Sequence, residues 1–282
     1  MKNTRLLSIF NFLSLLAHVG MAYATQSKLV NDNTVGEVSD QYPSLFTPIG
    51  FTFAIWGVIY TALIAFCIYH LVMAFAKPSM HPENKVTNRM GLWFILNNIA
   101  AVAWLAAWTD DLIGASTILI LIQLVSLMAI SIRTRIHDPR VSISSKIFTQ
   151  FPISIYFGWI TIAAIANIAV YLVSTGWDGF GWGYSPVTWT QFIIGLAILV
   201  TIVVVLSQRN VFYGLVVMWA LYGIIVKRES IDSSEYSAII QTAWIGIAVV
   251  GIVSLIQLVN NVSRKRVKEK PSIDSRREAM KG

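Results

Sequence analysis

The sequence predicts an all-α, polytopic membrane protein, a helix bundle with about eight transmembrane helices. Three observations lead to this prediction: 56% of the 282 residues are hydrophobic, only 12% are charged, and the charges fall between long apolar stretches. A soluble domain usually carries about a quarter of charged residues, which argues against a soluble fold. Helices are expected because each unpaired backbone group in lipid costs several kcal/mol.

Eight apolar stretches are each close to the ~20 residues that a helix needs to cross a hydrocarbon core about 30 Å thick. None of them contains Asp, Glu, Lys or Arg, so every charge falls in a connection or at a terminus. We place the stretches at residues 6–24, 49–76, 91–108, 112–132, 147–173, 187–207, 211–226 and 236–262.

The first stretch also imitates a secretory signal, because two basic residues precede it and Ala22-Tyr23-Ala24 offers an A-x-A cleavage site. Cleavage would leave seven helices. We expect the helix to be retained, since its removal would take one wall from the bundle. Within it, Asn11 and His18 are expected to form hydrogen bonds between helices rather than to bind a ligand.

Basic residues predict the orientation, because cytoplasmic loops of membrane proteins are enriched in Lys and Arg. With the N-terminus inside, 18 of the 21 basic residues fall in inner segments, and the outer segments hold only Lys28, Lys227 and Arg228. The outer segments carry nine of the fourteen acids. We therefore expect a multi-pass protein of the cell membrane with both termini in the cytoplasm.

Several classes of chemistry are not expected. The single cysteine, Cys67, excludes an intramolecular disulfide, and no phosphate-binding loop, nucleotide fingerprint or His-Glu-x-x-His motif occurs. No acid lies within a stretch, which argues against an ion-coupled pump. The four histidines do not cluster, and Asp110 and Asp111 are interpreted as a polar turn rather than an acid/base pair. We predict that the protein is not an enzyme, needs no cofactor and binds no nucleic acid.

Aromatic residues are the most distinctive feature, with ten Trp, ten Tyr and fourteen Phe. Trp177, Trp182 and Trp189 flank the outer end of the sixth stretch, where an interfacial belt is expected. Other tryptophans lie among small or amide residues on a helical face. Asn97, Trp104 and Trp108 share one stripe, and Trp159, Ala163 and Asn167 share another. Such stripes either pack helices together or line a cleft.

Residues 42–60 resemble the proline-rich first loop and second helix of the TspO/MBR family, the tryptophan-rich sensory proteins related to the mitochondrial translocator protein. Two prolines precede an aromatic residue, and Trp56 is followed four residues later by Tyr60. Asn97, Asn98 and Trp104 are similar to the family's third helix. The family's fifth helix is resembled by Pro152, Tyr156, Trp159, Ala163 and Asn167.

The resemblance covers residues 1–175 and implies a five-helix membrane domain. Three more transmembrane helices over residues 176–262 and a basic cytoplasmic tail over residues 263–282 then make this a longer branch with a C-terminal extension. The tail is expected to act as a topology signal, to attract anionic lipid headgroups, or both. The pattern of Val217, Tyr222 and Lys227 matches a weak cholesterol motif, from which we expect no sterol site.

The resemblance also implies a cleft, capped by the first loop, that binds flat hydrophobic ligands such as a porphyrin or a haem precursor. The protein would then be a sensor or carrier. Indole rings suit this task, because each aromatic pair contributes roughly 0.5–1.5 kcal/mol beyond area burial. The residues expected at the cleft are Pro43, Pro48, Phe53, Trp56, Tyr60, Asn97, Trp104, Trp108, Trp159, Ala163 and Asn167.

Two alternatives of another class stay open. The chain could be a facilitative transporter of another small hydrophobic solute, although no internal repeat links its two halves. A scaffold would need a partner that the sequence does not show. Small-residue pairs such as Ala100-Ala101 and Ala106-Ala107 permit close helix contacts, but they leave open whether the chain forms a homodimer.

Overall fold

The computed structural model of the chain describes residues 3–136, 138, 141–177 and 183–269, and within these ranges it contains helices and no strand. The predicted tail begins as a continuation of the last helix, while Trp182 and residues 270–282 lie outside the described part. The long helices are α1 (Thr4–Gln26), α3 (Ile55–Ala76), α5 (Trp93–Thr109), α6 (Ile113–Thr134), α8 (Phe151–Ser174), α9 (Pro186–Ser207), α10 (Val211–Asp232) and α11 (Ser237–Glu269).

Shorter elements fill the connections between the long helices. One end of the bundle carries α2 (Val35–Gln41) and the 3-10 turn η1 (Gly50–Ala54), which leads directly into α3. The other side carries α4 (Pro82–Met90), α7 (Ile143–Ser145) and the π-helical turn η2 (Lys146–Gln150), which leads into α8.

The predicted fold class is confirmed, because each apolar stretch coincides with one long helix. Seven described helices are long and apolar enough to cross a membrane alone. The stretch at 91–108 is α5, which qualifies only together with α4, and a bend of 51° separates the two. Gly91 ends α4 with a φ of 60°, a conformation that glycine adopts without strain. The helix α10 runs six residues beyond the predicted end at 226, since Lys, Arg and Glu are good helix formers.

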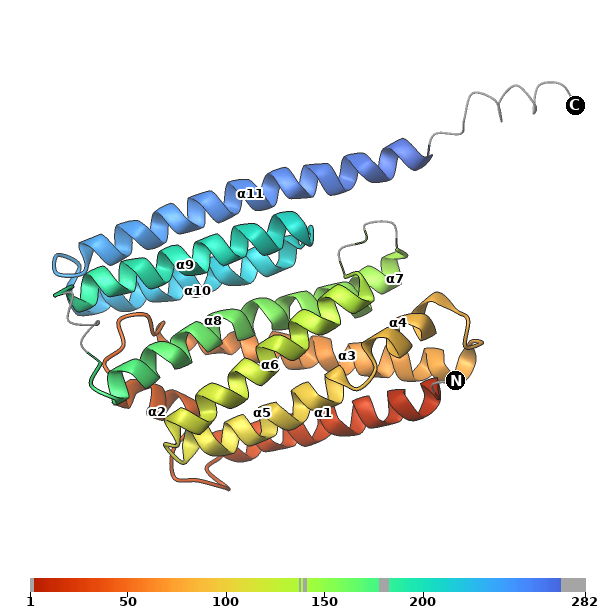
Figure 1. Ribbon diagram of the computed structural model, residues 1–282, viewed down its shortest axis with the longest axis horizontal. Coiled ribbons are helices and arrows are strands. Elements are labelled where there is room, and N and C mark those ends of the chain that lie inside the picture. The colour runs from red at the N-terminus through yellow and green to blue at the C-terminus, as the bar shows by residue number, and fades with distance from the viewer. Residues whose placement is uncertain (1–2, 137, 139–140, 178–182, 270–282) are drawn as a thin grey trace, which may run out of the picture.

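Five helices form a closed ring. In order around it, α1 packs on α3, α3 on α8, α8 on α6, α6 on α5, and α5 on α1. Outside the ring, α10 packs on α8, and α9 and α11 pack on α10. Figure 1 shows these last three helices as a layer on one side of the ring. The helix α8 is shared by both parts, and every residue from Pro152 to Ile162 is buried.

Close packing of α8 on α10 depends on Gly158. A Cβ atom at this position would lie 3.1 Å from the carbonyl oxygen of Tyr213 and 3.1 Å from Cβ of Val216. The neighbouring ring of Phe157 meets the Tyr213 ring edge to face, with centroids 5.1 Å apart. The two helices therefore approach closely over a small residue, and the outer layer rests directly on the ring.

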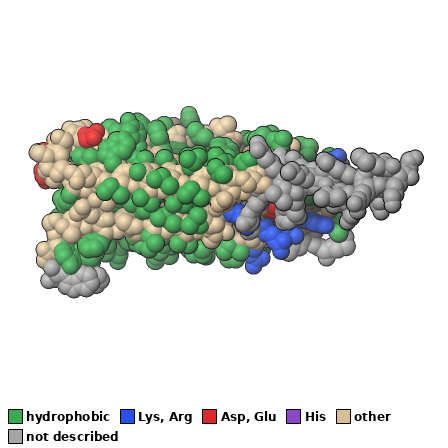
Figure 2. Space-filling model, turned by 90° about the horizontal axis from the view of Figure 1, so that it is seen from above, with side chains coloured by type: hydrophobic (Ala, Val, Ile, Leu, Met, Phe, Trp, Pro, Cys, Tyr) green, Lys and Arg blue, Asp and Glu red, His purple; other side chains and the backbone are tan. Residues whose placement is uncertain are grey.

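Charge is separated along the molecule. Acidic side chains are visible at one end and Lys and Arg toward the other, with apolar side chains covering the surface between them (Figure 2). Large apolar residues are exposed along every long helix, for example Leu13, Val58, Leu199 and Leu255. A soluble protein rarely exposes so continuous an apolar surface. The chain is a multi-pass membrane protein.

Candidate functional site

The half of the ring next to α2 and η1 contains a group of aromatic side chains from η1, α3 and α8. Trp56 and Tyr60, one turn apart on α3, stack with ring centroids 5.1 Å apart and an interplanar angle of 19°. The Trp159 ring meets Trp56 edge to face at 6.1 Å and Phe53 edge to face at 5.9 Å. These offset and edge contacts are the arrangements that aromatic quadrupoles favour.

A second aromatic wall comes from α5. Trp104 and Trp108 are one turn apart, and their rings stack with centroids 5.7 Å apart at 21°. The indole N–H of Trp104 donates to Oδ1 of Asn167 on α8 at 2.8 Å. The indole N–H of Trp108 donates to the carbonyl oxygen of Val35 at 3.0 Å. Each indole is thus fixed in orientation by a hydrogen bond to a different element.

Between the two walls lies a small cavity of about 50 Å³. Residues from α2, η1, α3, α5, α8 and the loop before η1 meet there, and we call this space the cleft. Its volume exceeds the ~10–15 Å³ that a water molecule requires, but it is far too small for a tetrapyrrole. The predicted residues that line it are Pro48, Phe53, Trp56, Trp104, Trp108, Trp159, Ala163 and Asn167.

Three predicted residues lie elsewhere. Pro43 lines a separate groove of about 340 Å³ between α8 and α9, and Tyr60 lines a groove on the other side of Trp56. Asn97 is fully buried, and its Nδ2 donates to the carbonyl oxygen of Gln123 at 3.0 Å. It stands two helical turns, about 10 Å, from Trp104 along α5, and the lining of the cleft does not include it. In the structure, Asn97 joins α5 to α6.

A larger groove of about 550 Å³ adjoins the cleft. It lies between α1 and α3 and shares Val35, Phe53, Trp56 and Trp104 with the cleft, so these side chains separate the two spaces. Its volume falls within the ~300–1,000 Å³ of typical ligand sites. At its margin Tyr23 is 69% exposed, so the groove reaches the side of the bundle. We call it the lateral groove.

Sequence reasoning missed the α1 side of the lateral groove. The residues that α1 contributes are Val19, Ala22, Tyr23, Thr25 and Gln26. They contain no tryptophan or amide stripe of the kind that drew attention to α5 and α8. The only signal was the small size of Ala22 on α1 and of Gly50 and Gly57 near the start of α3, which leaves space between the two helices.

Two buried polar atoms at the cleft have no hydrogen-bond partner. They are Nε1 of Trp159 and Oγ1 of Thr47, and both residues line the cleft. Each side chain is 2% exposed. A buried donor or acceptor without a partner costs about 1–3 kcal/mol. A bound molecule with polar atoms at its edge would satisfy both groups.

A family model described as TSPO-like protein matches residues 8–256. The chain belongs to this TSPO-like family. The matched residues include all five helices of the ring and continue through α9 and α10 into α11. No curated protein and no solved structure matches the chain. The family that the resemblance of residues 1–175 predicted is therefore confirmed.

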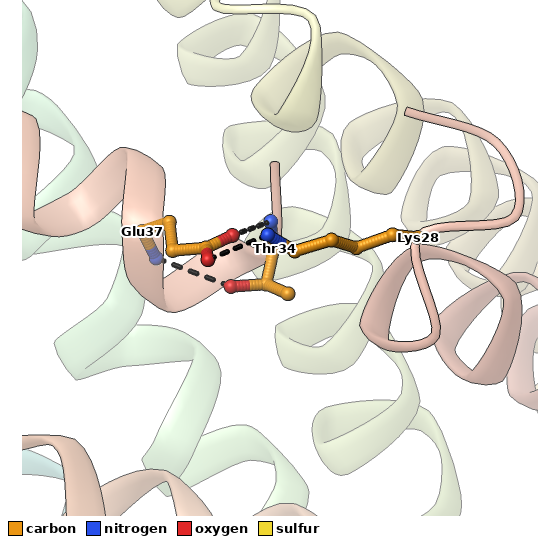
Figure 3. A network of polar contacts seen from close by, with 3 residues as sticks. All are labelled: Lys28, Thr34 and Glu37. Carbon is orange, nitrogen blue, oxygen red and sulfur yellow. Dashed lines mark hydrogen bonds and ion pairs between the residues drawn. The ribbon is translucent and has the colours of Figure 1, made fainter. Parts of the chain in front are cut away.

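The first loop of this TSPO-like protein, residues 27–49, covers the cleft, and we call it the lid. Its helix α2 begins with a capping box, in which the backbone N–H of Glu37 donates to Oγ1 of Thr34 at 3.3 Å and the N–H of Thr34 donates to Oε2 of Glu37 at 2.7 Å (Figure 3). Nζ of Lys28 lies 2.7 Å from Oε1 of Glu37. The hydrogen bond from Lys28, followed by that from the Thr34 backbone, lowers the pKa of Glu37 to about 2.

The lid is also tied to the turn between α5 and α6. The phenol of Tyr42 donates to Oδ1 of Asp111 at 2.7 Å. This hydrogen bond, with some burial, raises the pKa of Tyr42 to about 12. Nδ2 of Asn31 donates to Oγ1 of Thr109 at the end of α5. Asp111 in the turn between α5 and α6 therefore holds the lid through Tyr42.

His18 and Asn11 were both predicted to form hydrogen bonds between helices, and only His18 does so through its side chain. Nδ1 of His18 lies 3.1 Å from Oδ1 of Asn98, so the expected bond between α1 and α5 is confirmed. The side-chain amide of Asn11 has no hydrogen-bond partner, so that part of the prediction is wrong. Asn11 contributes only its carbonyl oxygen, which accepts from Sγ of Cys67 at 3.8 Å.

Proposed function

We propose that this TSPO-like protein is a membrane receptor or carrier for flat hydrophobic ligands of the porphyrin or tetrapyrrole class. The observation that carries the proposal is the convergence of Trp56, Trp104 and Trp159 on one cleft that also holds two unpartnered polar atoms. A tetrapyrrole is an apolar disc with a polar rim. Its faces suit the indole rings, and its rim suits the Trp159 N–H and the Thr47 hydroxyl.

The ligand occupies the cleft and the lateral groove together in this proposal. The cleft alone is too small, whereas the adjoining groove of about 550 Å³ has the required size. Phe53 and Trp56 stand between the two spaces and are only half-buried, so rotation of these two side chains would join the spaces. The ligand then reaches the site sideways from the lipid, between α1 and α3.

The orientation follows from the charges. In this proposal the end of the molecule where Lys and Arg gather (Figure 2) faces the cytoplasm, and the cleft and lid face outside. The supporting feature is the position of the acids, since Asp40, Asp110 and Asp111 all belong to the lid end. The proposed location is the cell membrane.

A receptor fits the packing better than a transporter of another hydrophobic solute. Transport needs a passage from the cleft toward the inner end of the ring. On that side of Trp159 the ring interior is filled by Tyr156, Phe66 and Phe94, each at most 1% exposed. The rings of Phe66 and Phe94 lie 5.3 Å apart, from α3 and α5.

The test is a titration of the detergent-purified full chain with protoporphyrin IX, followed by quenching of tryptophan emission. Trp56→Phe and Trp159→Phe are the site variants. Trp93→Phe is the matched control, because Trp93 lies at the inner end of α5 against Arg133. We expect saturable micromolar quenching that weakens in both site variants and not in the control. Unsaturable quenching, equal in all four proteins, would sink the proposal.

A further inference from the structure

The helix α10 is bound to the lid and to η1 by three polar contacts. Nε1 of Trp219 donates to the carbonyl oxygen of Thr52 at 3.0 Å. The carbonyl oxygen of Gly223 accepts from the backbone N–H of Ile49 at 3.1 Å.

The third contact pairs Nζ of Lys227 with Oδ1 of Asp40 at 3.0 Å. Trp219, Gly223 and Lys227 are spaced by four residues, so they form one stripe along α10. This stripe faces the segment that leads from the lid into α3. The helix α10, one of the three C-terminal helices, therefore holds the lid.

Gly223 allows the closest approach in this contact. A Cβ atom there would overlap Oγ1 of Thr52 and would lie 3.0 Å from Cβ of Pro48. Thr52 is fully buried, and its hydroxyl has no hydrogen-bond partner, so the fit is steric rather than polar. The absence of a side chain at Gly223 is thus what lets η1 rest on α10.

The contact lies immediately beside the wall of the cleft. Pro48 precedes Ile49, and Phe53 follows Thr52, and both Pro48 and Phe53 line the cleft. A displacement of Ile49 and Thr52 from α10 therefore displaces two cleft residues. The ion pair at Lys227 contributes less, because the Asp40 side chain is 70% exposed.

We propose that α10 positions the lid over the cleft, and that Trp219 and Gly223 thereby set how fast a ligand enters and leaves. This inference rests on the proposed function and assigns a role to the three C-terminal helices. Trp219 and Gly223 are positioning residues, since they act through Ile49 and Thr52. The lid is expected to open where α10 releases it.

The experiment compares Gly223→Ala with Gly251→Ala on the neighbouring α11. Both changes replace a helical glycine and gain similar helix propensity, but a Cβ at Gly251 meets only the Met218 side chain at 3.5 Å. Trp219→Phe keeps the ring and removes the N–H. Hydrogen exchange of the lid amides is measured without ligand, and the dissociation rate of protoporphyrin IX is measured by stopped flow.

We expect lid amides, including that of Ile49, to exchange about tenfold faster in Gly223→Ala and Trp219→Phe than in Gly251→Ala, since a lost contact mainly raises opening and dissociation rates. Dissociation of protoporphyrin IX should accelerate in the same two variants. Equal lid exchange in all proteins would overturn the inference, whether or not porphyrin binds. Faster exchange without any porphyrin binding by the unaltered protein would refute the proposed function and leave the structural contact of α10 with the lid supported.

Discussion

The hydrogen bond from Trp104 to Asn167 offers a direct test of how the cleft is held in shape. Asn167→Leu keeps the volume of the side chain and removes its polar atoms. The N–H of Trp104, which donates to Asn167 at 2.8 Å, is then left buried without a partner. The hydroxyls of Ser116 and Thr117 also lose a contact to Asn167, but each still donates to the carbonyl oxygen of Ile113.

The magnitude follows from this difference. Only the indole N–H loses every partner, so a destabilisation of about 1–3 kcal/mol is expected for Asn167→Leu. Hydrogen bonds between membrane helices average ~0.6 kcal/mol and reach ~1.7 kcal/mol in double-mutant cycles. The coupling between Trp104→Phe and Asn167→Leu should fall in that range.

The assay is reversible unfolding of the four proteins of the cycle in mixed micelles, followed by circular dichroism. A second cycle that combines Asn167→Leu with Trp93→Phe serves as control. Trp93 contacts Arg133 at the other end of α5, so these two changes should add without coupling. Coupling near zero in the first cycle, or equal coupling in both, would refute the assignment of this hydrogen bond.

Three further predictions concern the lid and the contact of the outer layer. The pKa of Glu37 lies near 2, below its ordinary value of 4.5, so its stabilisation of the lid is complete above the ordinary pKa and is lost as the pH falls toward 2. The protection factors of the lid amides, which correct for the intrinsic pH dependence of exchange, should therefore fall over this acid range in the unaltered protein and stay constant in Glu37→Gln. The pKa of Tyr42 is raised to about 12, so its bond to Asp111 persists above the ordinary pKa near 10 and is lost as the pH rises through 12. Difference absorbance should show one phenol fewer titrating near pH 12 in Tyr42→Phe than in the unaltered protein, and the loss of a phenol that titrates near pH 10 in this variant would contradict the contact. Gly158→Ala should destabilise the protein by about 1–3 kcal/mol through overpacking against Tyr213, whereas Gly195→Ala, with open space around its Cβ, should not, as thermal unfolding in detergent would show.

The membrane spans could be predicted because a span leaves a local signal. Charge-free stretches of about twenty residues have one physical explanation, and each became a helix. The bend at Gly91 was missed, since a single glycine in an apolar run does not reveal whether the helix continues or breaks. The extension of α10 through Lys227 and Glu229 was missed because hydropathy marks the edge of the hydrocarbon and not the end of a helix.

The cleft was predictable where its residues share one helix. Trp159, Ala163 and Asn167 line one wall because residues four apart lie on the same face. Contacts between helices are a different matter. The position of Asn97 outside the cleft depends on how far α5 slides along α8, and the grip of α10 on the lid joins residues more than 160 positions apart. No periodic pattern encodes either relationship.

The sharing of α8 between the ring and the outer layer has a mechanical consequence. Trp159 lines the cleft, and at the adjacent Gly158 the helix α8 packs directly against Tyr213 of α10. The helix α10 in turn contacts the lid, and the lid lines the cleft, so α8, α10, the lid and the cleft form a closed series of contacts. Tightly packed interfaces switch between discrete arrangements rather than deform gradually. If the proposed ligand displaces Trp159, we therefore expect α8, α10 and the lid to move together rather than one after another.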